Sequence, residues 1–366
     1  LAMPENPEDP ARILVIRLSA LGDVANTLPA VTALRRALPD ARIGWLTQKP
    51  SSDLIACAGV ADDIILYPRE RLGRLWSRTW RWPRALVETL RFARELRARE
   101  FTCSLDFQGN LKGGLLALAS GARDRIGFAR GHCREADWLF NNILAMPSSR
   151  RMLRADKHLC LAQALAPELE PVPVELHGSD EEVKRVEAFL ADLGRPLFAL
   201  QPGTSEFGRF KRWPAERFAE LARRLTERHR ATCVVTWGPG ERDLVEAVCE
   251  QSQGSARPAP ELSIGGLVEL LRRMDLFVAG DTGPAHIAAL LDRPLVAILG
   301  PKDPAVYAPC SDSALVVRKD IECSPCTRRT CDHVSCIMEI AVEDVLEGVE
   351  RVLGGRTQSE AAASTS

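Results

Sequence analysis

Short apolar runs alternate with amphipathic segments along the first half of the chain. Four runs have the length of buried strands, and they lie at residues 12–17, 42–47, 63–67 and 101–106. The first run is followed by a segment of helical periodicity at 23–38, and a further helix is predicted after Gly109. Buried strands separated by helices are typical of a parallel α/β sheet.

The same alternation restarts after a proline-rich stretch. Residues 167–174 hold three prolines between polar flanks, which predicts a linker. Four more apolar runs follow, at residues 196–200, 232–236, 276–279 and 294–299. We therefore predict two α/β domains of similar size, over 11–174 and 175–353, and a disordered polar tail over 354–366. Such sheets bind ligands outside the carboxyl ends of their strands, so the site is expected in the cleft between the domains.

Composition and charge restrict the classes of function. The 366 residues suit two domains, and the 46% apolar and 27% charged fractions are those of an ordinary globular protein. The formal net charge of −1 gives no overall attraction to nucleic acid. The sequence has no run of eighteen apolar residues and no apolar segment of the secretory type near residue 1. We therefore expect a cytoplasmic location and no nucleic-acid partner.

Three predicted strand ends in the second half carry small or hydroxylated residues before a helix. They lie at 203–205 (Gly-Thr-Ser), 237–241 (Trp-Gly-Pro-Gly-Glu) and 281–286 (Asp-Thr-Gly-Pro-Ala-His). At the third, Thr282 suits a helix N-cap, and free N–H groups at a helix start favour an anion such as a diphosphate. Glu241 is a candidate acceptor for ribose hydroxyls. Each turn alone is more often an ordinary cap, but three on adjacent strand ends favour a nucleotide.

Familiar nucleotide motifs are absent from the sequence. It has no Gly-x-Gly-x-x-Gly after the first strand, no P-loop and no Asp-x-Asp. Phosphate charge would then be met by protein groups, for which Lys211 is the candidate; the alternative is a surface lysine before a helix. In the first half, Asp23 follows the strand that ends at Arg17. It can act as general base to a sugar hydroxyl, or it can merely favour a helix N-terminus.

Residues 69–99 form a strongly basic segment that contains tryptophans. Many arginines surround Trp76, Trp80 and Trp82, and the opposing acids are Glu70, Glu88 and Glu95. One interpretation is a peripheral membrane contact, with arginines meeting phosphates and tryptophans at the lipid interface. The other is a solvated basic helix whose tryptophans pack inward.

A cysteine segment lies near the C-terminus, with the spacing Cys-x2-Cys-x4-Cys-x4-Cys. Its members are Cys323, Cys326, Cys331 and Cys336. Four thiolates from one loop can bind a structural zinc or iron, and His333 can join them; the alternative is a compact loop of disulfides or free thiols. This loop lies far in sequence from the predicted donor turns, so we expect no cofactor for catalysis.

The motifs, in this order and spacing, resemble the bacterial ADP-heptose:lipopolysaccharide heptosyltransferases of glycosyltransferase family 9. The matching strings lie at 19–23 with 27–29, at 106–110, at 201–204 with 211–214, and at 281–286, and the resemblance spans about 13–353. It implies a GT-B fold, in which two Rossmann-like domains with parallel sheets face a central cleft. It also implies inverting transfer of heptose from ADP-L-glycero-D-manno-heptose to the lipopolysaccharide inner core, either Kdo2-lipid A or the first heptose. The enzyme would then work at the cytoplasmic face of the inner membrane.

The resemblance further implies site residues. Asp23 matches the catalytic base, and Lys211 would stabilise the leaving ADP. The donor positions are Thr204, Ser205, Lys211, Glu241, Asp281, Thr282, Gly283 and His286. The acceptor positions are Arg17, Gln108, Asn110, Lys112 and Arg125. Residues 20–29 are most like members that add the first heptose, whereas the cysteine segment is more like others. A protein O-heptosyltransferase with cysteine-bound iron or zinc, and a non-catalytic nucleotide-binding or redox protein, remain alternatives.

Overall fold

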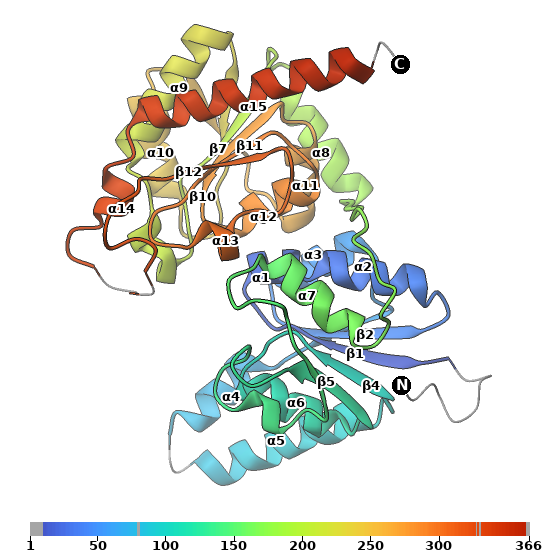
Figure 1. The fold of residues 1–366 in the computed structure, drawn as a ribbon. Coiled ribbons are helices and arrows are strands. Elements are labelled where there is room, and N and C mark those ends of the chain that lie inside the picture. The colour runs from blue at the N-terminus through green and yellow to red at the C-terminus, as the bar shows by residue number, and fades with distance from the viewer. Residues whose placement is uncertain (1–9, 79–80, 327, 329–330, 364–366) are drawn as a thin grey trace. The chain divides into compact units, whose positions relative to one another are not determined.

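The computed structural model describes residues 10–363 apart from 79–80, 327 and 329–330 (Figure 1). The chain divides into two compact units, Leu1–Val174 and Glu175–Ser366. Each unit contains a six-stranded sheet, and every strand pair is parallel. Both sheets have the strand order of the doubly wound Rossmann-like fold. The predicted α/β class with two parallel sheets is therefore confirmed.

The first sheet has the order β3-β2-β1-β4-β5-β6. Its strands are β1 Arg12–Ile16, β2 Arg42–Thr47, β3 Asp63–Leu66, β4 Cys103–Asp106, β5 Asp124–Phe128 and β6 Ile143–Ala145. Its helices are α1 Leu21–Ala25, α2 Leu28–Ala37, α3 Ser51–Ala58, α4 Arg69–Trp76, α5 Trp82–Arg97, α6 Leu111–Ser120 and α7 Arg154–Gln163, with a 3-10 turn, η2, at Asp137–Leu139. The strand order reverses between β1 and β4, which is where ligands of such sheets bind. Because Ile16 pairs with Asp106, the turns that follow these two strands start side by side.

The helix predicted over 23–38 is two helices in the structure, α1 and α2, which meet at Thr27. Pro29 stands in the first turn of α2. A proline has no N–H to donate to the preceding turn but suits the start of a helix, so the chain restarts there. The break leaves Asp23 on a short helix directly above the end of β1.

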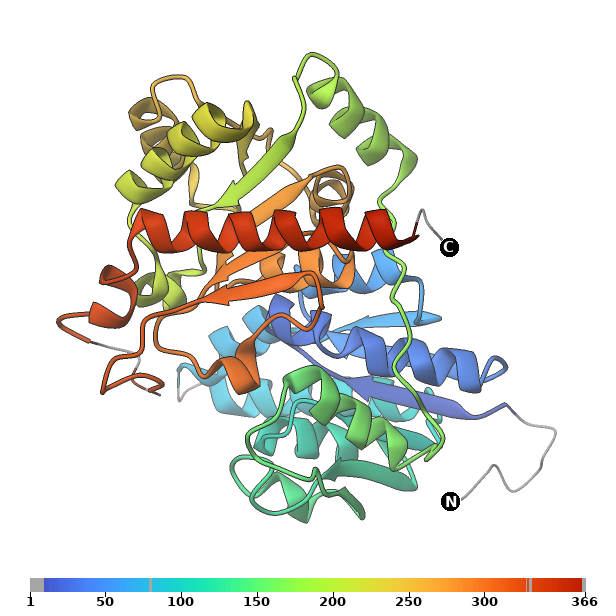
Figure 2. The same ribbon diagram turned by 45° about the horizontal axis from the view of Figure 1, so that its top comes forward.

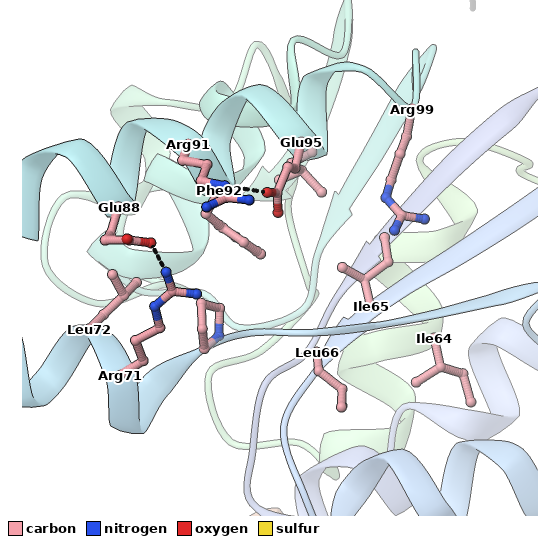
Figure 3. Close-up of a pocket in the computed structure, with 12 residues that line it drawn as sticks. Ile64, Ile65, Leu66, Arg71, Leu72, Glu88, Arg91, Phe92, Glu95 and Arg99 are labelled. Atoms are coloured by element: carbon pink, nitrogen blue, oxygen red, sulfur yellow. Dashed lines mark hydrogen bonds and ion pairs between the residues drawn. The ribbon is translucent and has the colours of Figure 1, made fainter.

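Helices α4 and α5 carry the basic segment beside β3. A hollow of about 420 Å³ opens between them, and Arg71 reaches across it to pair with Glu88 (Figure 3). Much of the rest of α5 faces outward, because Ala85 and Leu96 are its fully buried residues within the described range. None of the helices in the described residues is both long and apolar enough to cross a bilayer.

The second sheet has the order β12-β11-β10-β7-β8-β9, again with a reversal beside its first strand. Its strands are β7 Leu197–Gln201, β8 Thr232–Val235, β9 Ala256–Pro258, β10 Leu276–Gly280, β11 Leu295–Ile298 and β12 Ala314–Val317. Its helices are α8 Asp180–Leu190, α9 Ala215–His229, α10 Arg242–Gln251, α11 Ile264–Arg272, α12 Gly283–Leu290, α13 Pro304–Tyr307, α14 Ser335–Met338 and α15 Val342–Ala363, with a 3-10 segment, η3, at Glu206–Lys211.

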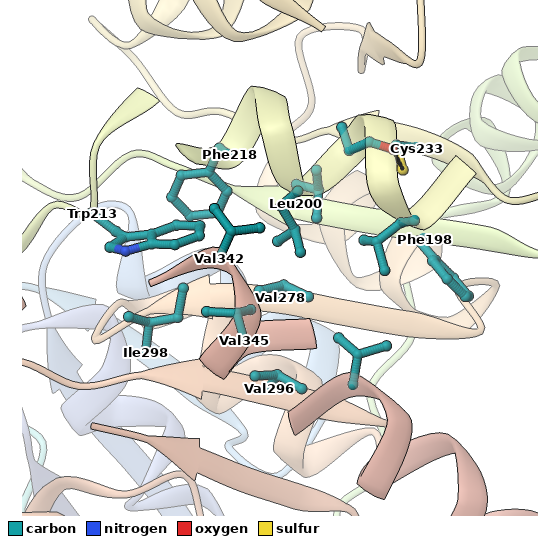
Figure 4. Packing of buried hydrophobic residues seen from close by; sticks show 14 of the residues in the cluster. Phe198, Leu200, Trp213, Phe218, Cys233, Val278, Val296, Ile298, Val342 and Val345 are labelled. Carbon is teal, nitrogen blue, oxygen red and sulfur yellow. Dashed lines mark hydrogen bonds between the residues drawn. The ribbon is translucent and has the colours of Figure 1, made fainter. Parts of the chain in front are cut away.

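A large apolar core stabilises this second unit. Helices α9 and α15 lie beside one another over the sheet (Figure 2). Phe218 from α9 packs edge-to-face on Trp213, with ring centroids 5.0 Å apart, and Val345 of α15 lies in the same cluster (Figure 4). The indole of Trp213 also donates to the carbonyl of Ile340 at 2.8 Å, so the segment that carries Lys211 is fixed to the core.

Helix α15 continues to Ala363, well into the tail predicted to be disordered from Gly354. The residues after Gly355 include alanines, glutamate and glutamine, which favour a helix once a preceding turn has formed. The structure therefore describes a helix over most of the segment for which the sequence predicted disorder, and residues 364–366 lie outside the described range.

Candidate active site

Two arginines hold Asp23 at the carboxyl end of β1. Its Oδ2 lies 2.5 Å from Nη2 of Arg17, and its Oδ1 contacts Nη1 of Arg154. Burial raises the pKa of Asp23, but the charges of Arg17 and Arg154 lower it more, so the net pKa lies well below the usual range. The Asp23 side chain keeps 25% of its surface exposed. It is therefore an ionised carboxylate that is partly open to solvent.

Helix α7 supplies two residues that the sequence analysis missed, Arg154 and His158. They are four positions apart, so they share one face of the helix. Nδ1 of His158 lies 3.0 Å from the hydroxyl of Thr27, which in turn donates to the carbonyl of Asp23 at 2.8 Å. Burial, together with the charge of Arg17, lowers the pKa of His158 well below its usual range. A neutral His158 therefore holds the backbone of Asp23 in place, and the spacing Arg-x-x-x-His was the signal that could have revealed it.

The turn after β4 supports Asp23 from the other side of the strand reversal. Nη1 of Arg17 donates to the carbonyl of Phe107 at 2.5 Å, and Leu18 N–H donates to Oε1 of Gln108 at 3.0 Å. Two of the predicted acceptor residues, Arg17 and Gln108, are thereby brought together beside Asp23.

The other predicted acceptor residues have different surroundings. Asn110 is the N-cap of α6 and accepts from Gly113 N–H at 3.2 Å. Lys112 is exposed, with Nζ 5.3 Å from the centroid of the Tyr67 ring. Arg125 stands near the amino end of β5, where its guanidinium donates to the carbonyls of Ala122 and Phe140. The structure therefore does not bring Arg125 to Asp23, because these carbonyls hold its side chain near the start of the strand.

In the second unit, the three predicted turns follow adjacent strands, since β10, β7 and β8 are neighbours in the sheet. Nζ of Lys211 lies 2.6 Å from Oδ2 of Asp281, and both side chains are largely buried. Thr282 is the N-cap of α12, yet its buried hydroxyl makes no hydrogen bond to the residues the structure describes. An ammonium group, a helix N-terminus and an unused hydroxyl thus stand together at the end of β10, which suits an anionic ligand.

Glu241 is largely buried and accepts hydrogen bonds inside the second unit. Its Oε2 accepts from the side chain of Gln201 at 3.2 Å and from Gly238 N–H at 2.9 Å. Arg212, which the sequence analysis did not single out, donates to the carbonyl of Thr204 at 2.5 Å and lies 3.7 Å from Glu241. Glu241 therefore braces the turns after β7 and β8.

The remaining donor positions lie on the same turns. Ser205 is exposed at the end of the β7 turn, Gly283 is the first residue of α12, and His286 is buried one turn further along that helix.

The structure describes all four thiols of the cysteine segment. Within the described part of the chain, no three His, Cys, Asp or Glu side chains converge as metal ligands would. The four thiols range from exposed at Cys323 to buried at Cys336, and burial, with neighbouring thiols, raises the pKa of Cys336. The predicted structural zinc or iron therefore stays a prediction, with the thiols of Cys323, Cys326 and Cys331 near that of Cys336.

Two tryptophans of the basic segment, Trp76 and Trp82, face outward rather than into the core. Trp76 is 46% exposed and Trp82 50% exposed, and their rings contact each other with centroids 6.4 Å apart. Trp80 lies outside the described residues. Of the two interpretations of this segment, the structure disfavours the one with inward-packed tryptophans.

Comparison with known proteins gives a consistent result. The family described as "Glycosyltransferase family 9 (heptosyltransferase)" matches residues 89–336. Lipopolysaccharide heptosyltransferase 1 of Pseudomonas aeruginosa is 29% identical over 327 residues, which cover 88% of each chain. Among solved structures, a glycosyl transferase family 9 protein from Veillonella parvula has a TM-score of 0.75 and 22% identity, over 94% of this chain and 97% of that one. The Escherichia coli heptosyltransferase WaaC with ADP has a TM-score of 0.72 and 20% identity, over 93% and 99%.

Proposed function

Because this chain belongs to glycosyltransferase family 9, the heptosyltransferases, and shares their GT-B fold, we propose that it transfers heptose from ADP-L-glycero-D-manno-heptose to the lipopolysaccharide inner core. The first-heptose acceptor, Kdo2-lipid A, is the acceptor we favour, since lipopolysaccharide heptosyltransferase 1 is a relative over most of both chains. The observation that carries the proposal is the placement of charge. Each sheet presents an ion-paired carboxylate beside its strand reversal, Asp23 after β1 and Asp281 after β10.

In this proposal Asp23 is the general base. Its carboxylate takes the proton of the acceptor hydroxyl while that oxygen forms a bond to the anomeric carbon of heptose. The bond from that carbon to the diphosphate breaks at the same time, and ADP leaves with the electron pair. Attack from the face opposite the leaving group inverts the anomeric centre. A positioned base of this kind typically contributes about 10²–10⁴-fold to the rate.

The low pKa of Asp23 makes it a weak base while both arginines are bound to it. A negatively charged acceptor would compete for Arg154, the more exposed of the two arginines. As Arg154 turned to the acceptor, its hold on Asp23 would weaken and the basicity of Asp23 would rise. An anionic acceptor such as the Kdo region of lipopolysaccharide would then activate the base as it binds. A protein acceptor without such charges would not, and for this reason we favour the lipid.

Lys211 and the start of α12 serve the donor in this proposal. The diphosphate carries most negative charge as it leaves, and the Lys211 ammonium can share its hydrogen bonds between Asp281 and a phosphate oxygen. The free hydroxyl of Thr282 and the first N–H groups of α12 would add donors. Thr204, Ser205 and Gly283 complete this edge, Glu241 is assigned to the ribose, and Asp281 with His286 to the donor sugar.

The acceptor is a lipid, so we also propose a peripheral contact with the cytoplasmic face of the inner membrane. Half-exposed apolar side chains gather on two neighbouring helices, and they are Leu86, Val87 and Leu90 on α5 and Leu111, Leu115 and Leu118 on α6. Arginines of the segment 69–99 surround those of α5. Arginine next to exposed aliphatic side chains suits an anionic lipid surface.

This contact is tested by sedimentation with vesicles that contain phosphatidylglycerol. Val87→Glu should weaken binding about tenfold, because burying such a side chain contributes about 1.5–3 kcal/mol. Met338→Glu, the same apolar-to-acidic change at an exposed residue of the second unit, is the matched control and should bind like the unaltered protein. Equal binding of both variants would contradict the contact through α5.

The transfer itself is tested with ADP-heptose and two acceptors, Kdo2-lipid A and its heptosylated product, followed by mass spectrometry. A gain of one heptose on Kdo2-lipid A is the expected result. A gain on the heptosylated acceptor alone would assign the second step instead. No gain on either acceptor, with ADP still bound, would contradict the lipid acceptor and favour a protein acceptor.

A further inference from the structure

Two carboxyl groups, Asp106 at the end of β4 and Asp137 in η2, are buried against each other in the first unit. Both residues are fully buried and their side chains are in hydrogen-bond contact. Two successive glycines of α6 make room for them. A Cβ on Gly113 would lie 2.4 Å from Asp106 Oδ1, and a Cβ on Gly114 would lie 2.6 Å from Asp137 Oδ1. The helix is therefore shaped to receive this pair.

The hydrogen bonds of the pair leave a place for one proton. Oδ1 of Asp106 accepts from Gln108 N–H at 2.9 Å and from Gly109 N–H at 3.2 Å. Oδ2 of Asp137 accepts from the amide of Asn141 at 3.5 Å. The other two oxygens, Asp106 Oδ2 and Asp137 Oδ1, are buried and accept no hydrogen bond of normal geometry from the described residues, although the Gly114 N–H lies close enough to Asp137 to lower its pKa. Two ionised carboxylates in contact repel each other, so one proton held between them satisfies both.

The charged neighbours of the pair favour a single negative charge. Arg17, the residue that follows β1, attracts Asp106 and is already bonded to Phe107 and Asp23. The thiol of Cys133 lies near Asp137, and α6 presents no charge toward the pair.

Among the described residues, Lys157 of α7 lies near the Cys133 thiol but donates to the carbonyl of His132. On α7, His158 is neutral and packs edge-on against Phe107, while Arg125 of β5 is held by the Phe140 carbonyl. Burial and the Asp137 carboxyl raise the pKa of Asp106 well above its usual range.

The pair holds the turn that in turn holds Asp23. Asp106 fixes the backbone N–H groups of Gln108 and Gly109, where Gly109 has a φ of 60° that favours glycine. That turn presents the Phe107 carbonyl to Arg17 and the Gln108 side chain to Leu18 N–H. A shift in Asp106 would therefore move both supports of the proposed base.

We propose that Asp106 and Asp137 share one proton at neutral pH, and that this proton locks the turn 106–109 and so positions Arg17 and Asp23. The two aspartates are positioning residues. Loss of the shared proton in alkaline solution places two negative charges in contact, which opens the turn and displaces Arg17. A measurement of enzyme activity depends on the proposed heptose transfer, whereas a direct measurement of the shared proton does not.

The test uses Asp137→Asn, because an asparagine amide can donate to Asp106 in place of the proton and does not titrate. Asp40→Asn, at an exposed position of the same unit, is the matched control. Infrared spectra of the full chain at about pH 7, in H₂O and D₂O, show the C=O band of a protonated carboxyl group. The exposed carboxyl groups of the chain are ionised at that pH and do not contribute to this band. We expect this band in the unaltered protein and in Asp40→Asn, and its loss in Asp137→Asn. If Asp137→Asn fails to fold, the Asp106→Asn/Asp137→Asn double variant is measured instead.

Activity gives the second readout. We expect kcat of Asp137→Asn to stay within about threefold of the unaltered enzyme at pH 7, and its alkaline loss of kcat to move by at least about one pH unit upward. A carboxyl band missing from the unaltered protein, or retained at full strength in Asp137→Asn, overturns the shared proton. If the carboxyl band behaves as expected but the alkaline loss of kcat is the same in Asp137→Asn as in the unaltered enzyme, the proton is shared and has no role in positioning Asp23. If neither acceptor is glycosylated, the proposed function has failed and the infrared result still decides the shared proton.

Discussion

The ion pair between Lys211 and Asp281 makes a quantitative prediction about donor binding. Replacing Lys211 with alanine removes the ammonium group proposed to meet the diphosphate. A hydrogen bond to a charged group is worth about 1.5–3 kcal/mol, or roughly 10–150-fold in Kd. The variant also leaves Asp281, whose side chain is 12% exposed, without its partner beside an anionic ligand. The Asp281 carboxylate would then repel the diphosphate. At a separation of about 6 Å and an effective dielectric constant of about 20, this repulsion would weaken binding by a further ~2–3 kcal/mol at most.

Lys211→Ala should therefore raise the Kd for ADP by about a hundredfold or more, measured by isothermal titration calorimetry. The double variant Lys211→Ala/Asp281→Asn should recover about tenfold of this loss, because the uncompensated carboxylate is gone. Lys184→Ala, at an exposed lysine of α8, is the matched control and should leave the Kd unchanged. A double variant that binds ADP no more tightly than Lys211→Ala, or a single variant within twofold of the unaltered protein, would refute the assignment of this pair to the diphosphate.

Three further predictions follow from the same geometry. Arg154→Gln should raise the pKa of Asp23 by about 1–2 units, so the acid limb of the kcat/KM profile should move to higher pH, and an unmoved limb would contradict the pairing. Gly203→Ala should lower the free energy of unfolding in urea by about 1–3 kcal/mol, because the new Cβ would lie 2.1 Å from Glu241 Oε2; unchanged stability would show that Glu241 is not held there. Elemental analysis of the purified protein decides the predicted structural metal: a stoichiometric zinc or iron would support a site at the cysteine segment, and metal well below one per chain would leave free thiols there.

Sequence periodicity predicted the centres of both sheets better than their edges. The central strands β1, β4, β7 and β10 and the inner strands β2, β8 and β11 are buried along most or all of their length, as expected for strands covered on both faces. Of the edge strands, β3 was predicted, whereas β6, β9 and β12 were missed, and so was β5 beside β6. The missed edge strands have only three or four residues, which is too few for a periodic pattern to stand out in the sequence. Edge position weakens the signal because one side of the strand needs no partner.

The same limit applies to the candidate site. Asp23, Arg17 and Lys211 are visible in the sequence because they sit at strand ends next to motifs. Arg154 and His158 are far from Asp23 in the chain, and their helix gave no signal beyond its four-residue spacing.

Asp137 was missed for a related reason. It sits on a single 3-10 turn, and its contact with Asp106 depends on two glycines of another helix. Pairings of this kind depend on tertiary packing, so no local pattern can reveal them.

The central claim is that Asp23 is the base of a heptose transfer, and one measurement tests it most directly. Asp23→Asn and the unaltered enzyme are compared for transfer from ADP-heptose to Kdo2-lipid A by mass spectrometry, with the Kd for ADP measured in parallel. The account predicts a loss of at least about a hundredfold in kcat with an unchanged Kd, because the carboxylate acts on the acceptor and not on ADP. Turnover within a few-fold of the unaltered enzyme would contradict it.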